Sequence, residues 1–188
     1  MCKKPAINSL THPGCKAKYS IDGAISSLAY KGVVKKLMYQ FKYKHYLTDL
    51  KELLGELFYE GIIQNQIFHK ILIEKPILVP IPLHKDRFKI RGYNHAEILS
   101  IELSKKLNLP TLSLLKRTKK TKSQFGLTRE QRKENLKNAF SFSSSSTTPE
   151  SVFLVDDILT TGSTLIEAAS VLKRNGIKSV FGLTLARD

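Results

Sequence analysis

Residues 152–176 read VFLVDDILTTGSTLIEAASVLKRNG, and this stretch decides the fold. The apolar run at 152–155 predicts a buried strand, and the apolar spacing after Ser163 predicts a helix that ends at Gly176. A second apolar run, SVFGLTLA at 179–186, predicts another strand. Strand, helix and strand within about thirty residues form a βαβ unit, which implies a parallel sheet and an α/β fold class.

Two adjacent acids, Asp156 and Asp157, follow the first of these strands. A buried strand normally avoids adjacent charges, and in open α/β sheets ligands bind beyond the carboxyl ends of the strands. Residues 160–164, TTGST, then lead into the helix N-terminus, where backbone N–H groups and the helix dipole attract anions. Gly162 suits an unusual backbone conformation or a close ligand approach. The stretch predicts an anion site beside carboxylates that face sugar hydroxyls or a metal ion.

The rest of the chain supplies further elements. Residues 20–32 predict a pair of strands, and 31–43 and the segment after Thr48 predict helices. PILVPIPL at 76–83 predicts a buried strand, and NHAE at 94–97 has capping-box spacing before a helix that should end ahead of Pro110. Residues 141–150, SFSSSSTTPE, predict a solvent loop.

Positive charge is concentrated in three segments. Residues 31–44 carry five lysines and no acid, 84–91 carry four basic residues and one acid, and 116–137 carry nine basic residues and two acids. Their excess equals the net charge of the chain, +15, so the remainder is balanced. A confined cationic excess predicts a polyanionic partner, either phosphorylated small molecules or nucleic acid. The alternative is a surface that is basic for solubility alone.

The sequence also bears on the cellular compartment in which the protein is expected. No apolar run approaches the roughly 18 residues that a membrane span needs, and the N-terminus MCKKPAINSLTHPG has no hydrophobic signal segment. Cys2 and Cys15 are too few for a disulfide framework. We therefore expect a cytoplasmic protein with no membrane insertion.

The stretch VFLVDDILTTGST resembles the thirteen-residue signature of type I phosphoribosyltransferases at every defining position. The resemblance implies that Asp156 and Asp157 hold the ribose hydroxyls of 5-phosphoribosyl 1-pyrophosphate (PRPP). It also implies that Mg²⁺ binds with PRPP near these two acids. The residues implied to surround the 5′-phosphate are Thr160, Thr161, Gly162, Ser163 and Thr164.

Three other segments look like the ComF family of competence-associated, phosphoribosyltransferase-like proteins: VPIPLHKDRFKIRGYNHAE, LLKRTKKTKSQFGLTREQRKENLKNAF and LTLAR. The resemblance implies a type I phosphoribosyltransferase-like fold, with a twisted, mainly parallel sheet flanked by helices and a small N-terminal appendage. We expect this domain at residues 21–188 and a degenerate cysteine-containing segment at 1–20. In such proteins a loop like 79–87 lies beside the pyrophosphate, and a segment like 116–137 closes over the site as a mobile flap. Arg87, Lys89 and Arg91 suit a diphosphate, because guanidinium groups match phosphate oxygens.

ComF-family proteins typically begin with a zinc module of paired cysteines, and this sequence departs from that pattern. Only Cys2 and Cys15 remain, with Lys18 where another thiol would stand. Together with His12 they give at most three ligands, whereas a structural zinc wants four. We therefore expect Mg²⁺ with PRPP and no zinc.

Three functions compatible with the sequence remain open. The first is a ComF-like factor of DNA uptake in natural transformation, with a PRPP site, single-stranded DNA contact and a competence helicase-type partner. In this case Tyr39, Phe41, Tyr43 and Tyr46 would stack bases, although half-buried packing of the helix is the preferred interpretation of these aromatics.

The second function is a phosphoribosyltransferase acting on a nucleobase-type acceptor. Its catalytic residues would be Asp156 and Asp157, which orient the ribose, and Arg87 and Arg91, which stabilise the departing pyrophosphate. The third is a non-catalytic sensor of PRPP or a nucleotide.

Overall fold

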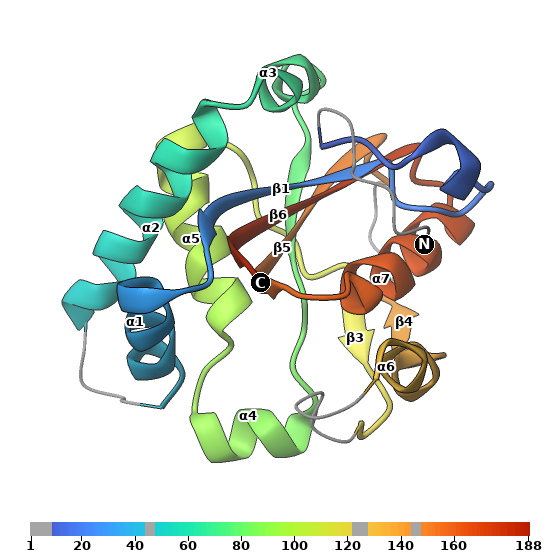
Figure 1. Cartoon of the computed structure of the whole chain (residues 1–188). Helices are drawn as coiled ribbons and strands as arrows, with labels where there is room; N and C mark the ends of the chain where they lie inside the picture. Colours follow the sequence, from blue (N-terminus) through green and yellow to red (C-terminus); the bar gives the residue numbers. More distant parts are fainter. Residues whose placement is uncertain (1–8, 44–47, 122–127, 144–147) are drawn as a thin grey trace.

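The computed structural model describes residues 9–43, 48–121, 128–143 and 148–188. Along the chain its elements are η1 (Pro13–Cys15), β1 (Gly23–Ala29), α1 (Gly32–Tyr43), α2 (Thr48–Ile63), α3 (Gln66–Leu72), β2 (Ile77–Pro80), α4 (Lys85–Arg91), α5 (His95–Leu107), β3 (Leu115–Arg117), α6 (Arg129–Leu136), β4 (Phe140–Phe142), β5 (Ser151–Leu159), α7 (Ser163–Arg174) and β6 (Ser179–Arg187). Figure 1 shows their arrangement around a central sheet.

The central sheet has the strand order β1-β6-β5-β2 in the described part of the chain, and each neighbouring pair is parallel. Strands β3 and β4 form a separate antiparallel pair. The chain passes from β5 through α7 to β6, the βαβ unit expected from residues 152–186. The predicted α/β class, with a mainly parallel sheet flanked by helices, is confirmed.

Strand β5 is apolar over residues 152–155 because both faces of the sheet are covered. Val152 and Leu154 belong to the hydrophobic core beneath α7, and Phe153 and Val155 belong to the core beneath the other helices. The alternation follows from the period of two along a strand. All four side chains are fully buried, which anchors the strand whose far end carries the acid pair.

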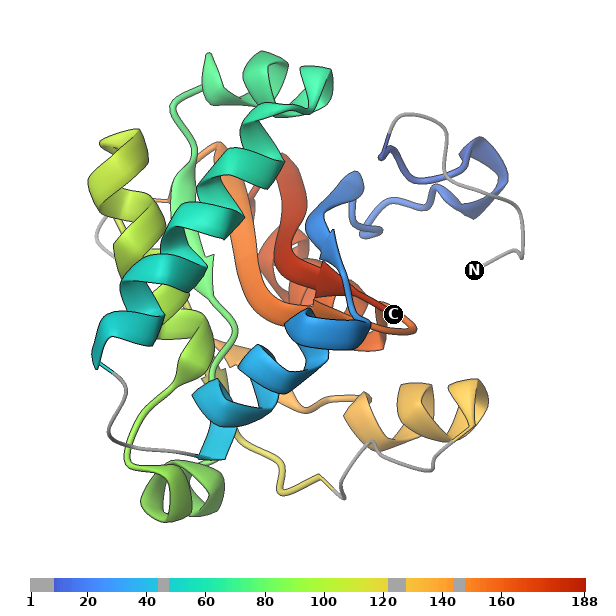
Figure 2. The same ribbon diagram turned by 60° about the vertical axis from the view of Figure 1, so that its left-hand side comes forward.

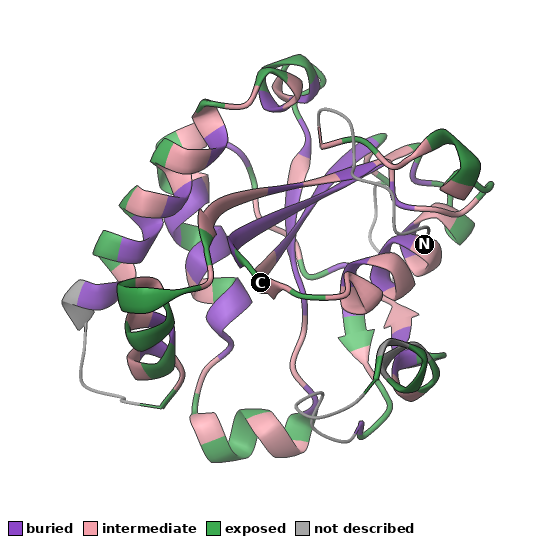
Figure 3. Ribbon diagram, in the orientation of Figure 1, coloured by how far each residue is buried: buried purple, intermediate pink, exposed green. Residues whose placement is uncertain are grey.

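Helices cover the two faces of the sheet unequally. Helices α1, α2, α3 and α5 lie on one side, with Phe58, Phe68 and Leu103 among their fully buried side chains. Helix α7, the β3–β4 pair and α6 lie on the other side (Figures 1 and 2). Strand β5 is buried over residues 151–155 and partly buried from Asp156 to Leu159, whereas the described surface of α6 is largely exposed (Figure 3).

Several elements differ from the sequence expectations. Residues 20–32 form one strand, β1, which pairs with β6, so the predicted strand pair is wrong. Strand β5 runs through both acids to Leu159, because it keeps its pairing with β6 up to Arg187. The predicted flap 116–137 contains the end of β3 and helix α6, while its residues 122–127 lie outside the described residues. Helices α3 and α4 were not expected.

The described part of segment 1–20 contains η1 and one antiparallel bridge, between Leu10 and Gly23 of β1. The division of the chain at residue 20 remains a prediction. Cys15 ends η1, and Cys2 lies outside the described residues. In the part of the chain that the structure describes, no helix is both long and apolar enough to cross a membrane.

Candidate functional site: a charged pocket at the carboxyl ends of the strands

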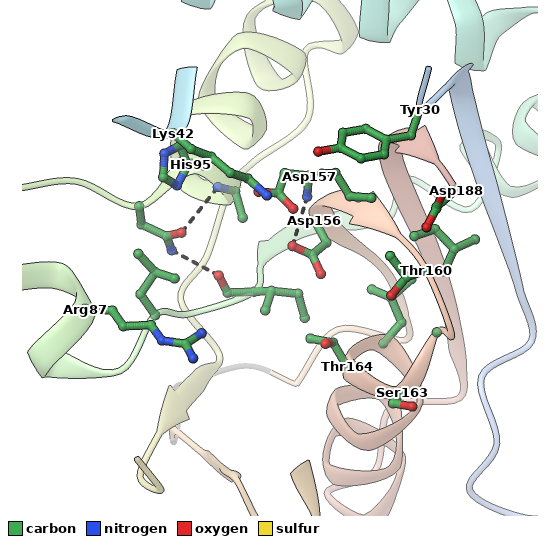
Figure 4. A pocket seen from close by; sticks show the side chains of 18 of the residues that line it. Tyr30, Lys42, Arg87, His95, Asp156, Asp157, Thr160, Ser163, Thr164 and Asp188 are labelled. Carbon is green, nitrogen blue, oxygen red and sulfur yellow. Dashed lines mark hydrogen bonds and ion pairs between the residues drawn. The ribbon is translucent and has the colours of Figure 1, made fainter. Parts of the chain in front are cut away.

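A pocket of about 510 Å³ opens at the carboxyl ends of β2 and β5 (Figure 4). Its lining combines the acid pair of β5, the turn into α7 and basic side chains from α1, α4 and β3. Ligands of open α/β sheets bind at this edge, because helix N-termini and loops converge there. The structure therefore brings the residues predicted from one stretch together with residues far from it in the chain.

Asp156 and Asp157 both line the pocket, on consecutive positions of β5. The backbone N–H of Asp157 donates to Asp156 Oδ1 at 2.9 Å. Burial, followed by the nearby charge of Asp157, raises the pKa of Asp156 from 3.8 to about 7. The two carboxyl groups thus influence each other's charge within one pocket.

Residues 160–164 form the turn from β5 into α7, and all but Thr161 of this turn line the pocket. Gly162 takes a left-handed conformation, φ 73°, at the start of α7. Thr161 Oγ1 lies 2.9 Å from Ser163 Oγ, so the two hydroxyls organise the turn. Small side chains and the helix N-terminus match the requirements of a phosphate site. We refer to residues 160–164 as the phosphate loop.

Arg87 and Arg117 enter the pocket from α4 and β3. One nitrogen of Arg87 donates to the Thr121 carbonyl at 3.1 Å, and one of Arg117 donates to the Thr121 hydroxyl at 2.6 Å. Burial and then the charge of Arg87 lower the pKa of Arg117 to about 10, and Asp156 opposes this shift. The Nε atom of Arg117 is buried and has no hydrogen-bond partner among the described residues. Two cations held together in this way favour an anion between them.

Arg91 also lines the pocket, and its guanidinium lies 5.5 Å from the centre of the Tyr43 ring. Arg91 therefore makes a cation–π contact with α1 and also faces the pocket. Lys89, the third basic residue expected to suit a diphosphate, is exposed on α4 and is not part of the pocket lining.

Lys42, from the last turn of α1, reaches the acid pair. Its Nζ lies 2.7 Å from Asp157 Oδ2, and both side chains are largely shielded from solvent. Sequence reasoning placed Lys42 only in a basic segment, because nothing local distinguishes it from Lys35 or Lys36. Arg117 was missed for the same reason, as one of many basic residues in 116–137.

The start of α5 forms the base of the pocket. Asn94 caps this helix as its sequence predicts, accepting from the Ala96 N–H at 3.2 Å, and its amide donates to the Ile81 carbonyl at 3.0 Å. His95 Nε2 lies 3.1 Å from the Phe41 carbonyl, and burial lowers the pKa of His95 to about 4. The buried imidazole is therefore neutral near pH 7 and links α5 to α1.

The acid pair can accommodate a magnesium ion that arrives with its ligand. Mg²⁺ usually takes one or two carboxylates together with substrate phosphates and water. Among the described residues no group of three or more histidine, cysteine or acidic side chains forms a ready metal site. A phosphorylated ligand would therefore have to complete the coordination.

The four aromatic residues considered for base stacking differ in how far they are buried. Phe41 is buried, as the packing interpretation expects, but Tyr39 and Tyr43 are 62% and 54% exposed. Their ring centres lie 4.9 Å apart on the outer side of α1. This ring contact along α1 fits the expected half-buried packing, and each of the two tyrosines keeps more than half of its area exposed. Tyr46 lies outside the described residues.

Comparison with known proteins places the chain in a family. A model of the phosphoribosyl transferase domain matches residues 91–187, which include the acid pair and the phosphate loop. Competence protein F of Haemophilus influenzae is 38% identical over 154 residues, covering 80% of this chain and 66% of that protein.

Two further relatives agree. DNA utilization protein YhgH of Escherichia coli K12 is 39% identical over 104 residues, 55% of this chain and 45% of that protein. Competence protein ComFC of Bacillus subtilis is 29% identical over 169 residues, 87% of this chain and 63% of that protein. The chain thus spans less than two thirds of the length of these relatives. Because the domain model covers residues 91–187, with the acid pair, and the relatives include Competence protein F and ComFC, the chain belongs to the ComF family of phosphoribosyltransferase-like proteins.

Proposed function

We propose that this protein binds PRPP, together with Mg²⁺, in the pocket at the carboxyl ends of β2 and β5, and that it acts in DNA uptake with direct contact to single-stranded DNA. The observation that carries the proposal is the joint placement of Asp156, Asp157, the phosphate loop and the Arg87–Arg117 pair around one pocket of about 510 Å³.

The parts of PRPP match three regions of the pocket. The 5′-phosphate fits the phosphate loop, where Gly162 lets the backbone approach closely. The ribose hydroxyls fit the carboxylates of Asp156 and Asp157, which accept hydrogen bonds. The diphosphate fits Arg87 and Arg117, since two guanidinium groups offer several donors in a fixed arrangement. Mg²⁺ would neutralise part of the diphosphate charge near the acid pair.

The three basic segments of the sequence support an anionic ligand. Each contributes cations to the pocket: Lys35 and Lys42 come from 31–44, Arg87 and Arg91 from 84–91, and Arg117 from 116–137. These segments are distant in the chain but meet at one edge of the sheet (Figure 1). A general demand for solubility would not bring them to a single pocket.

Pentosyl transfer is the second candidate function. Arg87 and Arg117 favour it, because a pair of cations beside a diphosphate also stabilises its departure. Release of pyrophosphate from PRPP in the presence of a panel of nucleobases would support transfer. Binding of PRPP without release across the panel would favour a PRPP sensor or adaptor.

The role in DNA uptake rests on the relatives, named for competence and DNA utilization, and on the outer face of α1. Tyr39 and Tyr43 are exposed there, beside Arg91 and the exposed Lys36. Aromatic rings among basic side chains bind single strands by stacking bases and attracting phosphates. We place single-stranded DNA on this face, next to the mouth of the pocket.

Calorimetric titration tests the PRPP site. We expect wild type to bind PRPP with Mg²⁺, and Asp157→Asn to lose about 1–3 kcal/mol, the scale of a hydrogen bond to a charged group. Glu150→Gln makes the same chemical change at an exposed residue just before the opposite end of β5 and should bind like wild type. Equal binding by wild type and Asp157→Asn, or no binding by wild type, would contradict the proposal.

Fluorescence anisotropy with labelled single-stranded DNA, measured over a series of salt concentrations, tests the second site. We expect affinity to fall steeply with salt, because lysines and arginines displace counterions. Tyr39→Ala/Tyr43→Ala should weaken binding about tenfold or more, as expected for the loss of a stacked base. Tyr19→Ala is the control, because Tyr19 also contacts cations, Lys18 and Arg174, away from α1. Equal losses for both variants would rule out α1 as the contact face.

A further inference from the structure

Lys42 is a cation already bound to the acid pair. Its Nζ lies 2.7 Å from Asp157 Oδ2, and the exposed fractions of the two side chains are 20% and 16% (Figure 4). This ion pair joins α1 to β5 across the pocket and differs from the exposed lysine pairs elsewhere, such as Lys178 with Glu150. Such shielding strengthens the attraction between the charges, since fewer water molecules screen them.

The fold holds Lys42 in this position through its neighbour in the chain. Phe41 is buried, and its carbonyl accepts from the Tyr93 hydroxyl at 2.6 Å and lies 3.1 Å from His95 Nε2. The Phe41 ring also meets His95 edge to face, with centres 5.0 Å apart. The last turn of α1 is therefore fixed against the start of α5, and the Lys42 side chain is directed at the acids.

A phosphorylated ligand needs such a cation at this place. Two adjacent carboxylates repel a polyanion unless nearby cations offset their charge. Lys42 and Arg117 both favour the ionised form of Asp156, and Lys42 also forms the ion pair with Asp157. An ammonium group beside Asp157 both offsets the negative charge and attracts the phosphates of a ligand whose sugar lies on the acids.

We infer that Lys42 is a ligand-binding residue that acts as the resident cation of Asp157 and lowers the dependence of sugar-diphosphate binding on a divalent metal ion. The inference rests on the proposed PRPP site and adds a residue to it. Removing the ammonium would leave Asp157 free to bind Mg²⁺, which accepts carboxylates together with substrate phosphates. Loss of Lys42 should therefore make binding depend on the metal.

The test is calorimetric titration of PRPP in EDTA and in Mg²⁺. In EDTA we expect Lys42→Met to bind PRPP about tenfold or more weakly than wild type, the scale for loss of a charged partner. In Mg²⁺ the difference should shrink. Lys42→Arg keeps the charge and should bind in EDTA far more tightly than Lys42→Met. Lys70→Met removes the same charge from α3, remote from the pocket, and should match wild type.

The outcomes separate this inference from the proposed function. Wild type that binds PRPP in neither condition overturns both. Wild type that binds PRPP only in Mg²⁺, or Lys42→Met that binds in EDTA as tightly as wild type or more tightly, overturns the role of Lys42 alone and leaves the PRPP site standing. A thermal unfolding curve for each variant checks the fold. If Lys42→Met is unfolded, the comparison of wild type with Lys42→Arg decides, since equal EDTA affinities support a charge at this position and a complete loss contradicts it.

Discussion

Asp156 and Asp157 are neighbours in sequence but differ in their partners. Asp157 has an ammonium group at 2.7 Å, whereas Asp156 accepts the Asp157 N–H, and the charges of Lys42 and Arg117 favour its ionised form. Burial, with the charge of Asp157, raises the pKa of Asp156 to about 7. Near neutral pH Asp156 is therefore poised between two protonation states, and a ligand that brings a cation would favour the ionised one.

The raised pKa of Asp156 predicts a dependence of stability on pH. Its ordinary value is 3.8, so between about pH 4 and 7 the folded state binds more protons than the unfolded state. Its contribution to the free energy of unfolding therefore falls as pH rises through this window. We expect Asp156→Asn to gain stability relative to wild type between pH 4 and 7, by at most about 1.4 kcal/mol per pH unit.

Urea unfolding of wild type and Asp156→Asn from pH 4 to 8 measures this difference. Wild type alone is not informative, because His95, with its pKa lowered to about 4, acts in the opposite direction between its ordinary 6.5 and that value. Both proteins carry His95, so its contribution largely cancels in the comparison. A difference in the free energy of unfolding that stays constant across the window would contradict the assigned shift.

At the level of residues, the sequence predicts the site residues that lie together in one short motif. It does not predict the site residues that come from distant segments and meet only in the folded chain. Asp156, Asp157 and the phosphate loop all lie within residues 156–164. The residue types and their spacing in this short segment therefore predict the site. Lys42 and Arg117 reach the pocket only because α1 and β3 pack at the same edge of the sheet. Their neighbours in sequence are equally basic, so no local pattern singles them out.

At the level of elements, helix α7 is flanked by two glycines with a positive φ angle, one before its first residue and one after its last. Gly162 has φ 73° at its start and Gly176 has φ 95° after its end. A Cβ at either position would meet neighbours only at ordinary contact distances, 3.6 Å from Leu159 and 3.8 Å from Thr148. The cost of a substitution is therefore mainly that of the backbone conformation.

The two glycines give a matched pair of variants, because both have a positive φ angle but only one lies in the pocket. We expect Gly162→Ala and Gly176→Ala each to lower the free energy of unfolding by about 1–2 kcal/mol, the cost of a left-handed L-residue. Only Gly162→Ala should also weaken PRPP binding, because only Gly162 lies in the phosphate loop. Chemical denaturation and calorimetry measure the two effects. Parallel losses of PRPP affinity in both variants would mean that the phosphate loop has no direct role.

Long elements with strong apolar patterns were predictable, including β5, α7, β6, α2 and α5. Helix α4 and the β3–β4 pair were not, because each is too short to carry a periodic apolar pattern. The predicted strand pair in 20–32 failed for a related reason. Strand β1 has its partner in β6, more than a hundred residues along the chain, and pairing at that distance has no local signal.

At the level of the whole molecule, the fold gathers charge that the sequence distributes. Segments 31–44, 84–91 and 116–137 account for the excess of +15, and each supplies side chains to one pocket. On the outer face of α1, Tyr43 contacts Arg91, which lines that pocket, and Tyr39 contacts Tyr43. A small phosphorylated ligand and a single strand of DNA would therefore occupy adjacent sites on one cationic edge.

A crystal structure of the protein with PRPP and Mg²⁺ tests the central claim most directly. We expect the 5′-phosphate on the backbone N–H groups of the phosphate loop, the ribose hydroxyls on Asp156 and Asp157, and the diphosphate beside Arg87 and Arg117. An empty pocket at saturating PRPP, or PRPP bound with its ribose away from the two acids, would contradict it.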